Sequence, residues 1–344
     1  MKTKFPTYYR PSAAKKQELF NDENSFFVFD TNALLDLYRL GKETTDKVLN
    51  LIDKYKSRII IPYHVAKEYH IDLLGVITSR IASYNNVLNA YNDEQILNML
   101  CDNLKLNELP TIKEKLKILI GDSISKFFKG VEEERDYLKE QFQSWTLQQK
   151  ISDSLGGNIL DPFNEEEIKA IESEGQKRYE NKIPPGYEDI KKDTNTFGDL
   201  IIWKEILRFA KSKSCSVIFI SRDLKEDWIL RRNGMDCGPR QELLEEFKNV
   251  SDGVFIMCTL NRFLEYANKE QKVLNDDDLK VAISTLSAWG KILNKYPVKS
   301  VSIEGATPKD NAKESDENMS TKSLKIILPD DMLASKTRDT IMDN

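Results

Sequence analysis

The chain has 344 residues, of which 40% are hydrophobic and 31% are charged, enough for one large domain or two modest ones with a buried core. Its 51 Lys and Arg against 56 Asp and Glu give a net charge of −5, so the field of the whole protein opposes a polyanion. The apolar runs are too short for a membrane-spanning helix, and the segment from Met1 to Pro6 leads into no secretory signal. We therefore expect a cytoplasmic protein with no membrane partner.

The cysteines and histidines are few. The four cysteines are scattered and form no Cys-x-x-Cys pair. This spacing argues against a zinc ribbon and against a disulfide framework, so we expect a reducing compartment. The two histidines, His64 and His70, leave little room for a histidine-based catalytic scheme. His64 and Glu68 are four residues apart and could share a helix face as a zinc site, but a third ligand is lacking and we interpret both histidines as structural.

Four short apolar runs predict buried parallel strands, and amphipathic helical patterns lie between them. These runs are residues 26–29, 58–61, 216–220 and 254–258. Strands that alternate with helices indicate an α/β sheet. The chain then divides into an N-terminal arm (1–25), an α/β domain (26–268) with a helical insertion (71–155), and a partly disordered C-terminal extension (269–344).

Two further segments are expected outside the sheet. A short acidic helix is predicted near 165–180, within an otherwise loop-rich connection. In the C-terminal extension, residues 304–320 have a disordered composition, and the apolar run 324–328 either docks a partner or is an incidental patch in a tail.

Acidic residues fall where the strands end or on the helices beside them. Asp30 ends the first predicted strand and Asp223 lies just past the third, at the edge where open parallel sheets bind ligands. Glu68 lies on the helix that Pro62 opens after the second strand, and Asp199 lies in the first turn of the helix before the third. Four converging acids repel one another unless cations neutralise them, and oxygen ligands suit Mg²⁺ or Mn²⁺. The pattern predicts metal-assisted hydrolysis of a phosphodiester.

Each acid also has a structural interpretation. Asp30 could cap the following helix, and Asp199 follows Thr196 at the spacing of a capping box. Glu68 could be a solvated helix residue, while Asp223 and Asp227 could pair with Lys225 or Arg231. Singly these signals are weak, and their joint arrangement favours the metal site.

An ordered series of motifs resembles the PIN-domain nuclease superfamily, in particular a PIN-like group of bacterial proteins. The motifs are residues 28–32 (Val-Phe-Asp-Thr-Asn), 61–68, 183–187 (Ile-Pro-Pro-Gly-Tyr), 198–203, 220–228 and 238–240, within a resemblance that runs from residue 5 to about residue 266. The resemblance implies a PIN-like α/β/α sandwich with a central, mainly parallel sheet. It assigns metal-binding and catalytic roles to Asp30, Glu68, Asp199 and Asp223, with Asn32 and Ser221 as polar neighbours and Asp227 as a possible fifth acid. The helical insertion and the tail depart from a minimal PIN domain.

The resemblance implies a Mg²⁺- or Mn²⁺-dependent endonuclease for which RNA is favoured over DNA, with single-stranded RNA as the expected partner. Such proteins include toxins, and PIN-like members occur near bacterial defence genes. Six basic residues are candidate phosphate contacts or, alternatively, ordinary solvated charges: Lys42, Arg222, Lys225, Arg231, Arg232 and Arg240.

Two other functions stay open. A non-cleaving PIN-like module would hold nucleic acid or a partner without hydrolysis, and a phosphatase-like or flap-nuclease-like hydrolase would use the same carboxylates on another phosphate ester. A protein partner could bind the helical insertion or the C-terminal tail.

Overall fold

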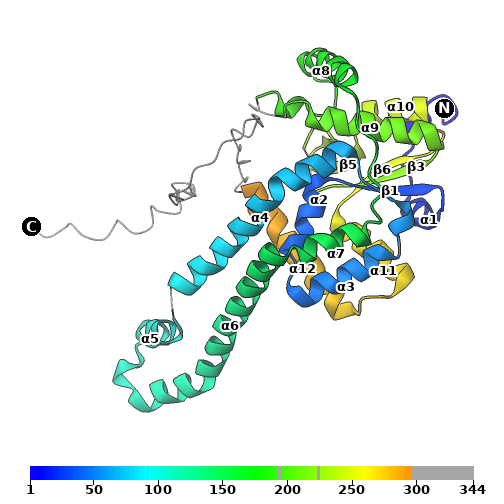
Figure 1. Ribbon diagram of the computed structural model, residues 1–344. Coiled ribbons are helices and arrows are strands. Elements are labelled where there is room, and N and C mark those ends of the chain that lie inside the picture. Colours follow the sequence, from blue (N-terminus) through cyan, green and yellow to red (C-terminus); the bar gives the residue numbers. More distant parts are fainter. Residues whose placement is uncertain (91, 192–194, 223–224, 296–344) are drawn as a thin grey trace, which may run out of the picture. The chain divides into compact units, whose positions relative to one another are not determined.

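A parallel sheet of four strands forms the centre of the protein (Figure 1). The computed structural model describes residues 1–90, 92–191, 195–222 and 225–295. The strands run in the order β2-β1-β3-β6 and all neighbours are parallel, which confirms the predicted α/β/α fold and its four strands. Their bounds are β1 (Ser25–Phe29), β2 (Ile59–Ile60), β3 (Ser216–Ile220) and β6 (Phe255–Cys258).

Twelve helices lie within the described part of the chain, and most of them connect or cover these strands. Their bounds are α1 (Ala13–Asn21), α2 (Thr31–Asp36), α3 (Lys42–Asp53), α4 (Tyr63–Ala90), α5 (Asp93–Asn103), α6 (Pro110–Ser144), α7 (Thr146–Ser154), α8 (Glu165–Glu180), α9 (Gly198–Lys213), α10 (Gln241–Val250), α11 (Leu260–Gln271) and α12 (Asp276–Lys295). The acidic helix expected near 165–180 is therefore confirmed as α8. Short 3-10 turns include η2 (Leu37–Arg39) and η5 (Tyr187–Asp189).

The sheet is apolar on both faces because alternate residues of each strand point to opposite sides. On one face Phe27 packs edge-on against Phe263 of α11 and Tyr55 near the end of α3. On the other face Phe26 packs against Phe209 of α9, and Phe255 against Phe247 of α10. The two layers of helices therefore bury both sides of the strands, as near-continuous apolar strands of a parallel sheet require.

A two-stranded antiparallel hairpin, which the sequence analysis did not predict, follows β3. It consists of β4 (Ile229–Arg232) and β5 (Met235–Pro239), joined at Asn233 and Gly234. Both turn residues have positive φ, 52° and 77°, as a type I′ turn requires. Arg231 and Arg232, two of the candidate phosphate contacts, therefore lie on a strand.

The predicted helical insertion (71–155) corresponds to helices α4 to α7. Residue 71 lies inside α4, which runs without interruption from Tyr63 to Ala90, so the helical segment begins as a continuation of a helix of the sheet domain. The described residues, up to 295, all belong to one compact unit. The expectations for 304–320 and 324–328 fall outside the described residues.

Candidate metal centre at the carboxyl edge of the sheet

The chain leaves β1 and β3 side by side, and both exits lie at the same edge of the sheet. Phe29 is the register partner of Ile220, and the backbone N–H of Asp30 donates to Ile220 O at 2.9 Å, which extends the ladder by one residue. Asp30 and Ser221 therefore follow neighbouring strands directly. β2 ends at the same edge, and the chain there enters α4, which carries Glu68. The parallel sheet thus brings together groups that are almost two hundred residues apart in sequence.

Asp30 is a buried carboxylate held by neutral donors. Its Oδ1 accepts from the backbone N–H of Thr31 at 2.8 Å, so Asp30 does cap α2, as one interpretation predicted. Its Oδ2 accepts from Asn32 Nδ2 at 2.5 Å and from the Ser221 hydroxyl at 2.6 Å. These donors orient the carboxylate without cancelling its charge, so the capping role is compatible with cation binding.

Asn32 ties the two strand exits together. Its Nδ2 also lies 3.1 Å from Ser221 Oγ, and its Oδ1 accepts from the backbone N–H of Arg222 at 2.7 Å. The structure therefore places both predicted neighbours, Asn32 and Ser221, against Asp30.

Glu68 reaches the same edge from α4. The Thr31 hydroxyl donates to Glu68 Oε2 at 2.5 Å, and Asn195 Nδ2 donates to Glu68 Oε1. His64, one turn earlier on α4, lies with Nε2 2.8 Å from Asn195 Oδ1 and 3.5 Å from Glu68 Oε1. These contacts fix the orientation of the Glu68 side chain. The sequence analysis did not predict the roles of Thr31, His64 and Asn195.

The two histidines do not share a site. His70 Nδ1 lies 3.1 Å from Gln148 Nε2, which connects α4 to α7 and not to Glu68. His70 therefore does not supply the third ligand that a zinc site at His64 and Glu68 would need.

Asp199 lies at the start of α9 beside a different set of partners. The N-cap of this helix is Phe197 and not Thr196, so Asp199 is its second residue and not the third, where a capping box would need it. Asp199 Oδ2 instead accepts from Trp228 Nε1 at 3.1 Å and lies 3.8 Å from Lys225 Nζ. Lys225 Nζ also pairs with the buried Asp189 at 3.0 Å, so this predicted phosphate contact lies between two carboxylates.

Asp227 is fully buried and braces the loop before α9. Its Oδ2 accepts from the backbone N–H groups of Gly186 and Glu188, at 2.9 and 3.3 Å. Gly186 has φ +91°, and a Cβ there would lie 2.2 Å from Tyr179 Oη and 3.1 Å from Asp199 Cβ. The loop therefore packs directly against Asp199, and Asp227 holds that loop in place.

Asp36 is a further buried acid, at the end of α2, and it accepts from two guanidinium groups. Arg39 Nη1 is 2.9 Å from Asp36 Oδ1, and Arg222 Nη1 binds the same oxygen. Burial raises the pKa of Asp36, although both arginines act in the opposite direction. Burial likewise lowers the pKa of Arg39 to about 10. Arg222, a predicted phosphate contact, is thus anchored to α2.

Glu205 is a further acid that the sequence analysis missed. It lies on α9 with only 1% of its surface exposed, and its Oε2 accepts from the backbone N–H of His64 at 3.1 Å, at the first turn of α4. Burial raises the pKa of Glu205 to about 7, the hydrogen bond from His64 lowers it, and the nearby Glu68 raises it. From sequence alone, a single Glu in a helix is expected to face solvent. The sequence therefore did not predict the contact between Glu205 and His64 N.

Among the described residues, no three His, Cys, Asp or Glu side chains are grouped so that they could hold a metal ion. Asp223 falls outside these residues. Asp30 and Glu68 lie in one network through Thr31, and Asp199 lies in the first turn of α9, four residues after the Glu68 contact Asn195. Carboxylate oxygens such as those of Asp30 and Glu68 are the ligands that a hard cation prefers. The described residues supply part of such a ligand set.

The chain matches a known protein family. A family described as "PIN like domain" matches residues 26–243, which include β1 to β5 and every predicted acid. The chain belongs to the PIN-like family. No curated protein and no solved structure matches. PIN-like domains have a nuclease-type fold, and the carboxyl edge of this PIN-like sheet is where Asp30, Glu68 and Ser221 meet.

The remaining predicted phosphate contacts of the PIN-like domain are spread over separate elements. Lys42 opens α3 and lies over the Tyr137 ring of α6 at 5.6 Å. Arg231 pairs with Asp236 across the hairpin, and Arg240 pairs with Glu242 at the start of α10. Arg232 donates to the backbone oxygen of Arg231. These contacts do not gather the basic side chains around Asp30.

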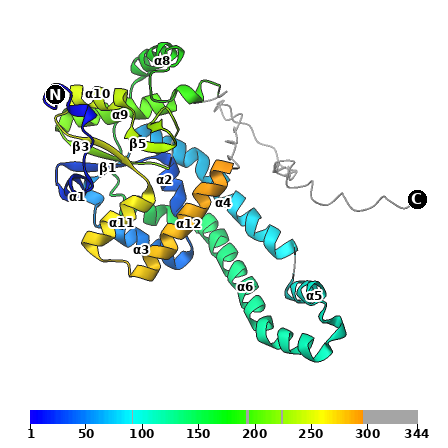
Figure 2. The ribbon, with the colours of Figure 1, turned by 180° about the vertical axis from the view of Figure 1, so that it is seen from behind.

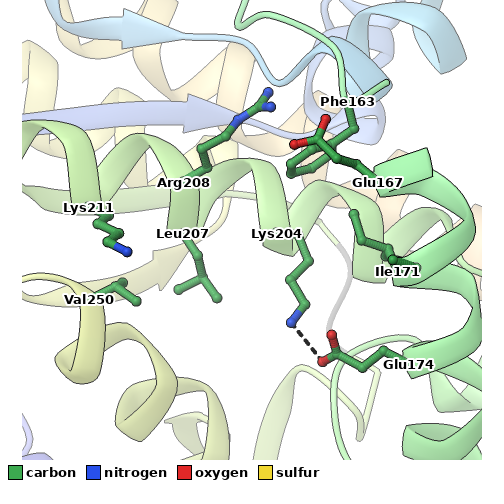
Figure 3. A pocket seen from close by; sticks show the side chains of 10 residues that line it. Phe163, Glu167, Ile171, Glu174, Lys204, Leu207, Arg208, Lys211 and Val250 are labelled. Atoms are coloured by element: carbon green, nitrogen blue, oxygen red, sulfur yellow. Dashed lines mark hydrogen bonds and ion pairs between the residues drawn. The ribbon is translucent and has the colours of Figure 1, made fainter. Parts of the chain in front are cut away.

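A groove of about 450 Å³ lies between α8 and α9 (Figure 3). Lys204, Arg208 and Lys211 line it, and Lys204 Nζ pairs with Glu174 at 2.7 Å. Given 3.6 residues per turn, these side chains leave α9 about 120–180° from Asp199, so the groove is separate from the acidic edge. No helix in the described part of the chain is both long and apolar enough to cross a membrane.

Proposed function

We propose that this PIN-like protein is a Mg²⁺- or Mn²⁺-dependent endonuclease that cleaves single-stranded RNA at the carboxyl edge of its sheet. The observation that carries the proposal is the bridge from Asp30 through Thr31 to Glu68, which joins carboxylates from two separate strand exits. In this proposal Asp30, Glu68, Asp199 and Asp223 hold the metal. When bound, the metal supplies a water of lowered pKa and stabilises charge on the phosphate.

The protein side chains have distinct tasks in this proposal. Asn32, Ser221 and the N–H of Thr31 are neutral donors that orient the Asp30 carboxylate. Thr31 and Asn195 orient Glu68. Asp227 holds residues 186–188 in position, and Gly186 of this loop packs against Asp199.

Cleavage of an end-labelled single-stranded RNA, with Mn²⁺ or with EDTA, tests this function. We expect cleavage only with metal, and loss of cleavage in Asp30→Asn and Glu68→Gln. Asp252→Asn is the matched control, because Asp252 is an exposed acid that pairs with Lys248 just before β6, at the opposite edge of the sheet. Cleavage that persists in EDTA or in both site variants would reject the proposal. Parallel assays with single-stranded DNA and a flap substrate decide the substrate class.

A second candidate function is a PIN-like module that binds nucleic acid without cutting it. The observation in its favour is that no three acids of the described residues form a metal-holding group. This module would bind single-stranded RNA in a filter assay with EDTA present. It would not cleave the RNA with Mg²⁺, with Mn²⁺ or with EDTA.

The resemblance to toxins and defence proteins extends the first proposal to a biological setting. A nuclease toxin would arrest the growth of a bacterial host on expression, and Asp30→Asn would relieve the arrest at equal protein level. Equal arrest by wild type and variant would argue against a role of the carboxylates in toxicity.

A further inference from the structure

The start of the chain, before α1, lies beside α10 in both views (Figures 1 and 2). It contains one 3-10 turn, η1 (Pro6–Tyr8), which packs against α10. Gln241 Nε2, on the first residue of α10, donates to the Thr7 hydroxyl at 2.6 Å. These contacts give the segment a defined place on the surface of the domain. We call residues 2–10 the aromatic segment.

Three residues of the aromatic segment have aromatic rings, and all three rings are exposed. Phe5 exposes 55% of its surface, Tyr8 61% and Tyr9 48%. The rings of Phe5 and Tyr8 lie edge to face, with their centroids 6.0 Å apart. Single exposed apolar side chains are common on any protein, whereas three within five residues form a concentration that is typical of an interaction surface.

The aromatic segment is also basic. Residues 1–17 hold five basic side chains and no acidic one, in a chain whose net charge is −5. Lys2 Nζ lies over the Tyr9 ring, 5.9 Å from its centroid. Arg10 Nη1 has no hydrogen-bond partner among the described residues. Within the same part of the chain, no carboxylate forms an ion pair with Lys2, Lys4 or Arg10, so these three cations are available to an anion from outside.

Two acids lie at the start of α10, where the aromatic segment packs, and both have partners of their own. Glu242 Oε1 lies 2.7 Å from Arg240 Nη2, and Glu245 Oε1 accepts from Gln241 Nε2 at 3.0 Å. These contacts occupy the carboxylates of α10 next to the aromatic segment, which leaves its positive charge in place.

A series of hydrogen bonds connects the aromatic segment to the proposed metal centre. Gln241, which donates to Thr7, directly follows Arg240. The backbone N–H of Arg240 donates to Trp228 O at 2.9 Å, and Trp228 Nε1 donates to Asp199 Oδ2 at 3.1 Å. The segment is therefore fixed to the part of the domain that holds Asp199, one of the proposed metal ligands.

We propose that the aromatic segment binds single-stranded RNA, whose bases stack on its three rings and whose phosphates contact its three cations. Rings beside cations suit a single strand, because every base has a π face and every linkage has a negative charge. In a double helix the bases stack on one another, so a duplex would leave the rings unused. An apolar protein surface would cover the rings but would leave the cations without partners. The inference takes its ligand from the proposed function and does not depend on cleavage.

Fluorescence anisotropy of a labelled single-stranded RNA of about 12 nucleotides, titrated with the full chain in EDTA, tests the stacking without cleavage. Phe5→Leu/Tyr8→Leu/Tyr9→Leu keeps apolar side chains but removes the rings, so the affinity should fall at least about tenfold. Tyr8→Phe/Tyr9→Phe keeps the rings and should bind as the wild type does. The matched control is Phe127→Leu, which removes a ring of similar exposure, 58%, on α6 and should not change the affinity. Circular dichroism shows whether each variant retains its helices.

The salt dependence of the same binding tests the cations. For a single strand, the slope of log K against log salt is about −0.7 for each phosphate that the protein neutralises. Lys2→Gln/Lys4→Gln should therefore make the slope shallower by up to about 1.4. The matched control is Lys115→Gln/Lys126→Gln, which removes two exposed lysines of α6 and should leave the slope unchanged.

Three results would overturn the proposal. The first is an equal RNA affinity of the wild type and the leucine variant, which would point to a protein as the occupant of the rings. The second is an equal salt slope in the two lysine variants, and the third is an RNA duplex that competes as well as the single strand. Ring-dependent binding without cleavage in Mn²⁺ would reject only the proposed nuclease, whereas metal-dependent cleavage with ring-independent affinity would reject only this inference.

Discussion

The Thr31 hydroxyl donates to Glu68 Oε2 at 2.5 Å while the Thr31 backbone N–H donates to Asp30 Oδ1 at 2.8 Å. One residue thus orients two carboxylates that reach the sheet edge from different connections. Thr31 is itself only 8% exposed, so its side chain has little freedom to turn away. The geometry makes Thr31 a positioning residue for the proposed metal centre.

Thr31→Val should therefore weaken function more than stability. Valine keeps the shape of threonine but lacks the donor to Glu68, and loss of a group that orients a ligand typically lowers metal affinity or activity by about 10–100-fold. The cost to the free energy of unfolding should be about 1 kcal/mol, as for one net hydrogen bond. Mn²⁺ calorimetry and RNA cleavage measure the first effect, and urea unfolding measures the second.

Thr31→Ser serves as the control for this change because it keeps the hydroxyl. It should retain most of the cleavage and Mn²⁺ binding. If Thr31→Val and Thr31→Ser behave alike, the hydroxyl has no part in placing Glu68.

Asp227→Ala separates a structural acid from a metal ligand. The change removes the acceptor for two backbone donors, Gly186 N and Glu188 N, in a fully buried position. Unsatisfied buried donors cost about 1–3 kcal/mol each, so unfolding should become easier by about 2 kcal/mol or more, with EDTA and with Mn²⁺ alike. Asp227→Asn should cost less because its amide oxygen still accepts.

Asp236→Ala is the control, since Asp236 is an exposed acid whose contact is with Arg231 on the hairpin. A ligand role for Asp227 would give a different result. Asp227→Asn would then leave stability in EDTA almost unchanged and would shrink the stabilisation that Mn²⁺ confers.

The strands and the first acids could be predicted from the sequence because the signals are local. A run such as 217–220 is apolar at every position, as a strand covered on both faces needs, and Asp30 and Ser221 directly follow such runs. The Asn233-Gly234 turn was an equally local signal that we did not use, although it marks the β4–β5 hairpin.

The partners of the acids could not be predicted in this way. Asn195 contacts Glu68 from 127 residues away, and Gly186 contacts Asp227 from a loop whose path depends on packing against Tyr179. Glu205 is buried because α9 packs under the first turn of α4, which no spacing within α9 reveals. Contacts of this kind depend on tertiary structure.

Glu205 should make stability depend on pH in the neutral range. Its pKa is raised to about 7 in the folded protein, whereas an unfolded Glu titrates near 4.5. The folded state therefore binds this proton more tightly, so the stabilising contribution is complete below about pH 4.5 and is lost as the pH rises through about 7. The full difference is on the order of 3 kcal/mol.

Glu205→Gln tests this dependence, because the amide oxygen can still accept from His64 N but cannot ionise. In EDTA, the variant and the wild type should melt at similar temperatures at pH 5, and the variant should melt higher at pH 8. A difference in melting temperature that stays constant from pH 5 to pH 8 would show that Glu205 does not titrate in this range.

Asp30 caps α2 and is a proposed metal ligand, and two measurements separate these roles. The cap contributes to stability in EDTA, whereas a metal ligand contributes to the stabilisation by Mn²⁺. Asp30 accepts from Thr31 N, Asn32 Nδ2 and Ser221 Oγ, and the two oxygens of its carboxylate share these bonds. Asparagine offers only one oxygen, so Asp30→Asn should lower the free energy of unfolding in EDTA by about 1 kcal/mol. Asp30→Ala loses the cap as well and should cost more, about 1–2 kcal/mol.

Melting curves with and without Mn²⁺ separate these losses from metal binding. A metal that binds only the folded state stabilises it by mass action, so the wild type should melt higher with Mn²⁺ and both Asp30 variants should gain much less. Ser221→Ala is the decisive control, because it removes one donor and keeps the carboxylate. It should lose stability in EDTA yet keep most of the Mn²⁺ shift. If Ser221→Ala and Asp30→Asn lose equal shares of that shift, Asp30 acts only as part of the hydrogen-bond network. If all variants keep the wild-type shift, the metal binds elsewhere.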